Sequence, residues 1–460
     1  MADKGVNINH TVSRMLNRPL VIASSGGGGH ITAAKGIIHH LRSQGAEIVK
    51  HRAQSYNKRY SNTVLALLQS FLYLKSLPNM APIGLCYESF HAEIQQLTQN
   101  AQNAPERDYL DLLLDLYSFG YEMAAIYNGL QRHDDVDSLI STVNQQAKND
   151  ALHYYFIKSR VLQVLTKQAA TGAPFTSIIS TQPQSLGAIC DAVMQYNLFS
   201  DATIRIQQYL TDLPTQGATH FTSSLQRLTF EQRQLMDVYV LDIQHSVLDD
   251  WMNLNIIKIH PQQNPMVRPG FKNIKKLQSL CDVDAHHVLS FKSNDVWQSR
   301  AISKGSRVAV IMLGSLGGDA AASYLKPLLW HGYEHIFIFG VTKNRALEAQ
   351  LSLLSWAEQC SIVVLAHQDD ETIASILTRA DCAIIRSGGL STMELMALPL
   401  RPNKMLLIHH KNPKDPQQSL TSGLTWEDGN ANCLMEYMRE RGVETHKTCP
   451  KYCLRDLVAS

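Results

Sequence analysis

The sequence predicts an α/β protein built from two parallel-sheet domains in tandem. Short apolar runs alternate with helix-length stretches in two separate parts of the chain, and in each part the first run leads directly into a group of glycines. Such alternation is typical of parallel sheets wound with helices, and glycines at the first strand-to-helix turn are typical of doubly wound domains. The length of 460 residues leaves room for two cores.

The first alternating part opens with a strand at 20–24 that runs into glycines and then into a helix at 32–43, as in a β-α-β unit. Residues 62–171 have mostly helical periodicity, so we expect a helical insertion there. Prolines and glycines at 261–270 end the series. The first domain is therefore predicted at 1–265, with further strands at 47–50, 177–180, 203–209, 236–241 and 255–259.

The second alternating part follows a helical bridge and predicts a second domain at 266–460. Ligands of open parallel sheets bind beyond the carboxyl ends of the strands. Two such domains facing each other therefore place a cleft between their glycine-rich loops. The strands of this domain are predicted at 308–313, 336–341, 362–365, 382–385 and 405–408.

Composition excludes several classes of protein. Forty-two Lys and Arg against 40 Asp and Glu leave a formal charge of +2, and 45% of residues are hydrophobic, so the chain is neither disordered nor a generic nucleic-acid binder. Eight cysteines without regular spacing indicate reduced thiols in a cytoplasmic protein. The richest apolar run, at 64–74, is too short to cross a bilayer. It is either a core helix or a helix lying on a membrane surface.

The glycine run that ends at His30 forms the first candidate site. Without Cβ atoms, Gly28 and Gly29 let a polar or anionic group approach backbone N–H groups at the start of a helix. A merely tight turn is the alternative, and the run is not a Walker A loop because no Gly-Lys-Ser/Thr follows. His30 is a candidate general base because the reference pKa of histidine is about 6.5. Capping or solvation of its side chain is the competing interpretation.

Two further glycine turns follow strands of the second part. Gly314 and Ser315 are candidates for cradling a diphosphate. Ser391 and Glu394 fit a Ser-x-x-Glu capping box at the start of a helix. The functional interpretation is that Glu394 accepts both hydroxyls of a ribose, while the preceding turn binds phosphate. The residues of that turn are Ser387, Gly388 and Gly389.

Three patterns suggest metal ligands but do not persuade us. Asp-x-Asp occurs at 135–137 and at 282–284, in neither case at a strand end, so solvated surface charge is the better explanation. His446, Cys449 and Cys453 have ligand-like spacing but no fourth partner nearby. We therefore predict no metal site.

Taken together, these motifs resemble the GT-B nucleotide-sugar glycosyltransferases. Within them the chain is most similar to monogalactosyldiacylglycerol synthase and to the peptidoglycan lipid I N-acetylglucosaminyltransferase (MurG-like). The resemblance covers about two thirds of the chain and omits the insertion and the tail. The matching segments occur in the family's order at 26–30, 211–213, 264–269, 314–315, 386–394 and 427–430.

The resemblance implies two Rossmann-like domains and an inverting transfer, without a metal or resident cofactor, from a nucleotide diphosphate sugar, a UDP-sugar above all. The implied acceptor is a lipid or another amphipathic molecule, or a protein, and the implied location is cytoplasmic, peripheral at a membrane surface. His30 and Asp212 would stand at the acceptor side. The donor would be held through its diphosphate, ribose, sugar and nucleobase by Gly314, Ser315, Ser391, Glu394, Glu427, Asp428, Asn430 and the backbone near His367 and Gln368.

The chain also departs from the family pattern. Gly217 stands where the family has a histidine after Asp212, and Trp426 replaces the first glutamine of the sugar-facing motif. His220 either replaces the missing imidazole or is merely solvated. Because fold does not fix reaction, a sugar-nucleotide hydrolase or epimerase and a non-catalytic binding protein remain as alternatives.

Overall fold

The structure is a computed structural model. It describes residues 17–23, 29–47, 137, 140, 143–144, 146–201, 203–244, 246–248, 253–293, 296–314, 319–340, 361–365, 367–412, 420 and 424–458. Most of the predicted insertion, including the apolar run at 64–74, lies outside these residues, as does most of the strand expected at 47–50.

The amino-terminal half contains a five-stranded sheet in the order β1-β2-β3-β4-β5, in which every described pair of neighbours is parallel. The strand expected at 203–209 begins later, at Ile206. The strands are β1 (Pro19–Ile22), β2 (Ser177–Ser180), β3 (Ile206–Tyr209), β4 (Met236–Leu241) and β5 (Asn255–Ile259).

The carboxyl-terminal half contains a six-stranded sheet in the order β10-β9-β8-β11-β12-β13, again parallel throughout its described pairs. The order reverses direction between β8 and β11. The two sheets confirm the predicted α/β class with two Rossmann-like halves. The strands are β8 (Val308–Met312), β9 (His335–Phe339), β10 (Ser361–Leu365), β11 (Cys382–Ile385), β12 (Met405–His409) and β13 (Glu444–Thr448).

The bridge between the sheets differs from expectation. Only one short helix, α10 (Ile274–Ser279), lies there, and an antiparallel hairpin of β6 (His287–Ser293) and β7 (Val296–Ile302) follows it. Leu289 and Phe291 are buried between exposed neighbours. This alternation with a period of two is that of a half-buried strand, so the prediction of a helical bridge is wrong.

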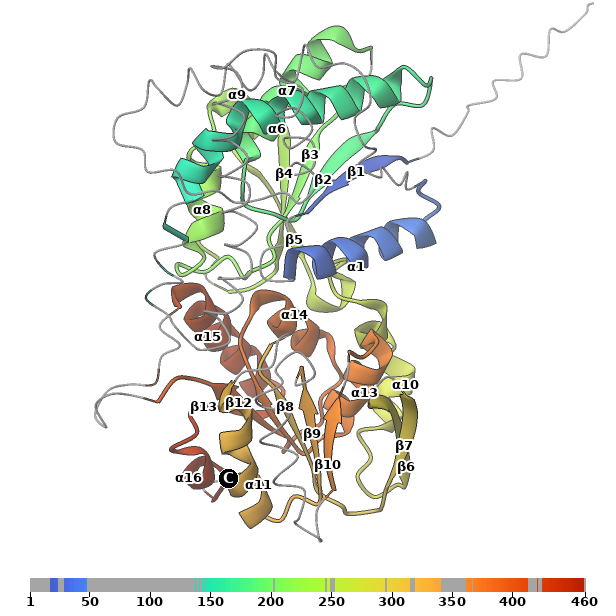
Figure 1. The fold of residues 1–460 in the computed structure, drawn as a ribbon, viewed down its shortest axis with the longest axis vertical. Helices are drawn as coiled ribbons and strands as arrows, with labels where there is room; N and C mark the ends of the chain where they lie inside the picture. Colours follow the sequence, from blue (N-terminus) through green and yellow to red (C-terminus); the bar gives the residue numbers. More distant parts are fainter. Residues whose placement is uncertain are drawn as a thin grey trace, which may run out of the picture.

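Helices cover both faces of each sheet (Figure 1). In β2, Ile178 packs with the cluster that includes α6 and α7, whereas Ile179 packs with the cluster that includes α1. Side chains at successive strand positions point to opposite faces, so strands covered on both sides are apolar at every position. The helices are α1 (Gly29–Ser43), α6 (Gln146–Ala169), α7 (Leu186–Phe199), α8 (Thr219–Gln226), α9 (Phe230–Gln234), α11 (Leu325–Trp330), α13 (Asp370–Arg379), α14 (Gly389–Ala397), α15 (Thr425–Arg439) and α16 (Cys453–Val458), with 3-10 turns at Pro261–Gln263, Pro269–Lys272 and Asp319–Tyr324.

The two halves share one apolar cluster. It runs from Ile37 of α1 through Met266 and Val267 of the linker to Met393 of α14. Figure 1 shows α1, α14 and α15 where the halves meet. The junction is therefore packed, and the carboxyl edges of both sheets lie close to it.

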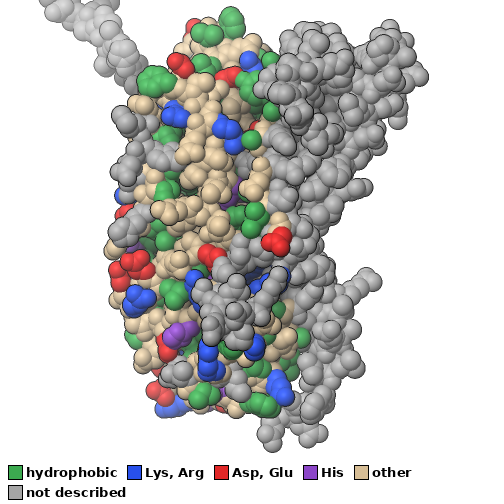
Figure 2. All heavy atoms as spheres, turned by 90° about the vertical axis from the view of Figure 1, so that its left-hand side faces the viewer, with side chains coloured by type: hydrophobic (Ala, Val, Ile, Leu, Met, Phe, Trp, Pro, Cys, Tyr) green, Lys and Arg blue, Asp and Glu red, His purple; other side chains and the backbone are tan. Residues whose placement is uncertain are grey.

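The surface agrees with the near-neutral composition. Acidic and basic side chains are interspersed on the face shown in Figure 2, and hydrophobic side chains are scattered over it. Within the described residues, no helix is both long enough and apolar enough to span a bilayer. The six cysteines in that part of the chain are free thiols.

Candidate active site

His30 lies in the first turn of α1, beyond the end of β1. The helix begins at Gly29 and not at residue 32 as expected, so the imidazole belongs to its amino-terminal turn. Its Nδ1 is 2.6 Å from the carbonyl oxygen of Thr181 and 3.0 Å from the hydroxyl of Thr211. These two residues follow β2 and β3, so three neighbouring strand ends hold one imidazole.

These contacts fix the protonation pattern of the His30 ring. A carbonyl oxygen only accepts hydrogen bonds, so Nδ1 must carry the proton that it donates to Thr181. The lone pair of the neutral ring is then on Nε2. Burial lowers the pKa of His30 below its ordinary value of 6.5, although the charge of Asp212 acts in the opposite direction. The ring is therefore neutral at pH 7 and has its basic nitrogen at Nε2.

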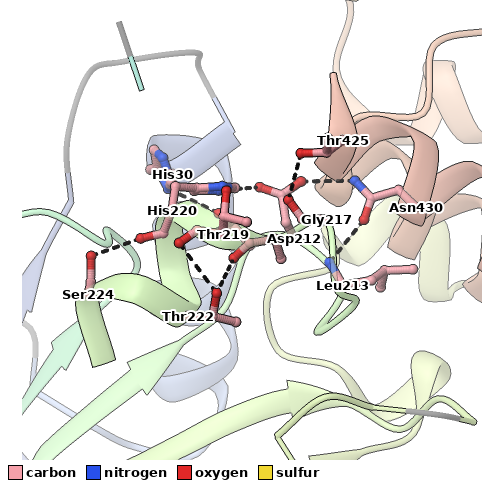
Figure 3. Close-up of polar contacts among 12 residues, drawn as sticks. His30, Asp212, Leu213, Gly217, Thr219, His220, Thr222, Ser224, Thr425 and Asn430 are labelled. Carbon is pink, nitrogen blue, oxygen red and sulfur yellow. Dashed lines mark hydrogen bonds and ion pairs between the residues drawn. The ribbon is translucent and has the colours of Figure 1, made fainter. Parts of the chain in front are cut away.

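Asp212 follows β3 and joins the two predicted acceptor-side histidines. His220 Nε2 lies 3.2 Å from Asp212 Oδ2 (Figure 3). The side chain of His220 is only 11% exposed and packs edge-on against the ring of Trp426 at 5.4 Å. Solvation is therefore not what accounts for His220. Burial alone would raise the pKa of Asp212, but hydrogen bonds from His220 and Asn430 hold it below its ordinary value.

Asn430 reaches this cluster from α15 in the other half. Its Nδ2 donates to Asp212 Oδ1 at 2.9 Å and to the carbonyl of Ser387 at 3.0 Å, and its Oδ1 accepts from the backbone N–H of Leu213 at 3.1 Å. The side chain is fully buried. Both amide hydrogens are thus used inside the protein, and direct contact of Asn430 with a donor sugar stays a prediction.

The departure at Gly217 has a steric cause. A Cβ at this position would lie 1.9 Å from the carbonyl oxygen of Thr425, at the start of α15. The Thr425 hydroxyl also donates to the carbonyl of Gly217 at 3.1 Å. A histidine at 217 would not fit against this backbone, whereas His220, one turn further on, reaches Asp212.

Gly314 and Gly388 are open turns on the two strands where the order of the second sheet reverses. Gly314 follows β8 with φ of +91°, a left-handed conformation that favours glycine. Gly388 follows β11, and an added Cβ would meet nothing within 4 Å at either position. The same holds for Gly29 beside His30. The candidate residues Gly28 and Ser315 lie outside the described residues.

The turn after β11 is arranged differently from the prediction. The helix α14 begins at Gly389 with Gly388 as its N-cap, so Ser391 lies inside the first turn and the predicted capping box is wrong. The helix starts earlier because Gly389 packs on the other half, where a Cβ would be 2.1 Å from the carbonyl oxygen of Thr211. The hydroxyl of Ser387 donates to the carbonyl of Glu427 at 2.8 Å.

Glu394, the candidate ribose ligand, makes a bidentate ion pair. Arg268 Nε donates to Oε1 at 2.6 Å, and Arg268 Nη2 donates to Oε2 at 2.9 Å. Burial raises the pKa of Glu394 above its ordinary value, and these two hydrogen bonds counter the effect. A ribose would have to share or replace the guanidinium.

Glu427 is likewise buried and paired, in this case with Arg386, whose Nε lies 3.0 and 2.9 Å from its two carboxylate oxygens. Asp428 Oδ1 is 3.3 Å from Nε2 of the buried His410, which follows β12. The sequence analysis did not select Arg386 or His410 as site residues. The rule that selected the glycine turns, position just after a parallel strand, would have found both.

Of the residues expected near the nucleobase, His367 is exposed and Gln368 is buried just after β10. Gln368 pairs with the backbone of Lys292 in β6, accepting from its N–H at 2.8 Å and donating to its carbonyl at 2.7 Å. The hairpin missed by the sequence therefore braces this loop.

The metal-like patterns do not assemble in the described residues. Asp282 Oδ1 accepts from the backbone N–H of Asp284 at 2.9 Å in an exposed turn. His446 is on β13, exposed and paired with Glu444 at 2.8 Å, whereas the two nearby cysteines are buried. No group of three or more potential metal ligands occurs in that part of the chain.

Comparisons with known proteins give one distant similarity. No family model and no curated protein matches the chain. Among solved structures, the chain is similar to the crystal structure of Acinetobacter baumannii MurG, with 11% sequence identity and a TM-score of 0.45, over 96% of this chain and 90% of that one. A similarity this distant assigns no function.

Proposed function

We propose that this protein is a glycosyltransferase that moves a sugar from a nucleotide diphosphate sugar to an acceptor hydroxyl. The observation that carries the proposal is an oriented neutral imidazole on α1, which contacts α14, facing a second sheet whose open glycine turns stand at its topological switch point. Switch points are where open α/β sheets bind ligands.

The second half would hold the donor. Backbone N–H groups at Gly314 and Gly388 would bind the diphosphate, since glycine lets an anion approach the backbone closely. The same N–H groups stabilise the negative charge that develops on the diphosphate as it leaves. Glu394 would accept from the ribose hydroxyls in place of one or both Arg268 donors.

The first half would supply the base. His30 Nε2 takes the proton of the acceptor hydroxyl while the acceptor oxygen bonds to the anomeric carbon and the diphosphate departs with the electron pair of its bond. Attack opposite to the leaving group inverts the configuration. Asp212 would stabilise the imidazolium formed at His30, because its carboxylate charge favours the protonated ring.

The family resemblance extends the proposal to a UDP-sugar donor and to a lipid or amphipathic acceptor met at a membrane surface from the cytoplasmic side. It also implies catalysis without a metal ion.

Incubation of the full chain with a panel of nucleotide sugars, with and without lipid extract, tests the function. We expect release of the nucleoside diphosphate that depends on added acceptor, together with a glycosylated product. Release without acceptor would indicate a hydrolase, and binding without turnover would indicate a binding protein. Turnover lost in EDTA and restored by a divalent cation would contradict the metal-free reaction.

A further inference from the structure

The loop at 211–217 is pressed directly against the other half of the molecule. Gly389 of α14 approaches the Thr211 carbonyl so closely that a Cβ would be 2.1 Å away, and Gly217 of the loop approaches the Thr425 carbonyl at 1.9 Å in the same sense. Gly429 of α15 faces the Thr215 hydroxyl at 2.2 Å. Three glycines therefore allow backbone contact between the halves that any larger residue would prevent.

Asn430 makes the polar counterpart of this contact. It lies on the buried side of α15 and hydrogen-bonds on one side to Asp212 and Leu213 and on the other to Ser387. The first two partners belong to the amino-terminal half and the third belongs to the carboxyl-terminal half. One amide thus ties the loop after β3 to the turn after β11.

The bond to Asp212 orients a carboxylate of the candidate active site. Asp212 receives His220 on Oδ2 and Asn430 on Oδ1, from opposite sides (Figure 3). If the halves separated, Asp212 would keep its contact with His220, which belongs to the same half, and would lose Asn430. Closure of the halves and orientation of Asp212 are therefore one event.

We propose that Asn430 is a positioning residue that latches the two halves together and sets the orientation of Asp212, so that the cluster of His30, Asp212 and His220 is complete only when the halves are closed. The catalytic consequence rests on the proposed function, whereas the latch itself does not.

The substitution Asn430→Asp tests the latch through pH. It places a second carboxylate within hydrogen-bond distance of Asp212, and two carboxylates that close share a proton at low pH and repel at high pH. The other charged groups nearby are His220 on α8, His30 on α1, and Glu427 on α15, which Arg386 neutralises. Because imidazoles titrate in the same range, the native protein is measured at each pH as the reference.

Small-angle scattering of the full chain measures the closure without any substrate. We expect the radius of gyration of Asn430→Asp to exceed that of the native protein at pH 8 and to return toward it at pH 5. Asn432→Asp, which adds the same charge to an exposed position of the same helix, should match the native protein at both pH values. An Asn430→Asp radius equal to the native one at pH 8 would overturn the latch.

A second variant guards against misfolding of the first. Gly217→Ala inserts a Cβ against the Thr425 backbone without adding charge, so we expect a larger radius at both pH values and unchanged circular dichroism. A native radius for this variant would also overturn the proposal.

Activity, where it is measured, adds an independent readout. Loss of a hydrogen bond to a charged group should lower kcat of Asn430→Asp about 10- to 100-fold at pH 8, with recovery at lower pH relative to the native enzyme. If the radius responds as expected but no sugar is transferred by the native protein, the proposed function fails and the latch stands.

Discussion

The two edges that meet at the junction hold their polar groups in opposite ways. On the amino-terminal edge, His30 is oriented through one ring nitrogen, and the proton on Nδ1 leaves the lone pair on Nε2. On the carboxyl-terminal edge, the acidic candidates Glu394 and Glu427 are each held by an arginine through both carboxylate oxygens.

This difference separates a group prepared to react from groups prepared to hold the fold. Glu427 and Arg386 are both almost fully buried, so their pairing is needed to keep two charges out of water. Arg268 is 23% exposed at its side chain and therefore accessible to exchange with a ligand. Glu394 is the carboxylate of this edge that a ligand can most easily reach by displacing its partner.

The largest expected effect falls on the amino-terminal edge. His30→Ala should lower turnover by about 10²- to 10⁴-fold, the range for loss of a general base. Nucleotide affinity, measured by calorimetry, should remain because the donor binds in the other half. His39→Ala, the same change at an exposed position of α1, is the control. Equal turnover in both variants would remove His30 from the chemistry.

Stability should respond most on the carboxyl-terminal edge. Arg386→Ala leaves the Glu427 carboxylate buried without its partner and should lower the free energy of unfolding by about 3–5 kcal/mol. Arg439→Ala, at the exposed end of α15, should change it by less than about 0.5 kcal/mol. Denaturant unfolding of both variants gives the comparison, and a loss as small as that of the control would mean that Glu427 is not a structural group.

Glu394 should show both behaviours at an intermediate size. Glu394→Gln keeps the shape but loses the charge, so we expect nucleotide affinity to fall by about 1–3 kcal/mol through weaker hydrogen bonds to the ribose. Unfolding is measured separately, because loss of the ion pair with Arg268 also destabilises the fold. Unchanged affinity in a folded variant would assign Glu394 to structure alone, like Glu427.

Sequence reasoning predicted the buried parallel strands well because burial on both faces makes them continuous apolar runs, as at Cys382–Ile385. It missed β13, an edge strand of Glu, Thr, His, Lys and Thr, because only its hydrogen bonds to β12 mark it as a strand. The hairpin β6–β7 was missed for a similar reason, since most of β7 is exposed.

The candidate site was predicted as loops but not as contacts. Position after a strand located His30, Asp212 and Gly388 correctly as residues of strand-to-helix connections. Asn430 and Asp212 are 218 residues apart in sequence, and only the packing of one half on the other brings them together. The pairing of Glu394 with Arg268 depends on the path of the linker for the same reason.

The pH dependence sharpens the assignment of the base. Catalysis needs neutral His30, and burial lowers its pKa below 6.5, so the acid limb of kcat/KM should have its midpoint below pH 6.5 and fall about tenfold per pH unit beneath it. Asp212→Asn removes a charge that raises this pKa and should move the midpoint lower still. A midpoint above 6.5 would contradict a buried base.

Stability shifts in the same direction. The folded state holds His30 with a pKa below that of the unfolded chain, so the unfolded state binds more protons as pH falls through 6.5. The stability contributed by neutral His30 is therefore present above pH 6.5 and is lost progressively below it. His30→Gln should flatten this part of the profile of unfolding free energy against pH.

The smallest expected effect separates the two neighbouring glycines of the turn after β11. A Cβ at Gly388 meets nothing within 4 Å, whereas one at Gly389 would strike the Thr211 carbonyl. Gly388→Ala should therefore change the free energy of unfolding by no more than about 0.5 kcal/mol, because reduced freedom of the unfolded chain offsets a poorer N-cap. It should still weaken nucleotide binding, since the methyl group occupies the space through which a diphosphate would approach the backbone. Gly389→Ala is the matched variant and should lose stability or open the junction. If Gly388→Ala binds nucleotide as tightly as the native protein, the diphosphate does not bind at this turn, and the open glycines of the second half have another purpose.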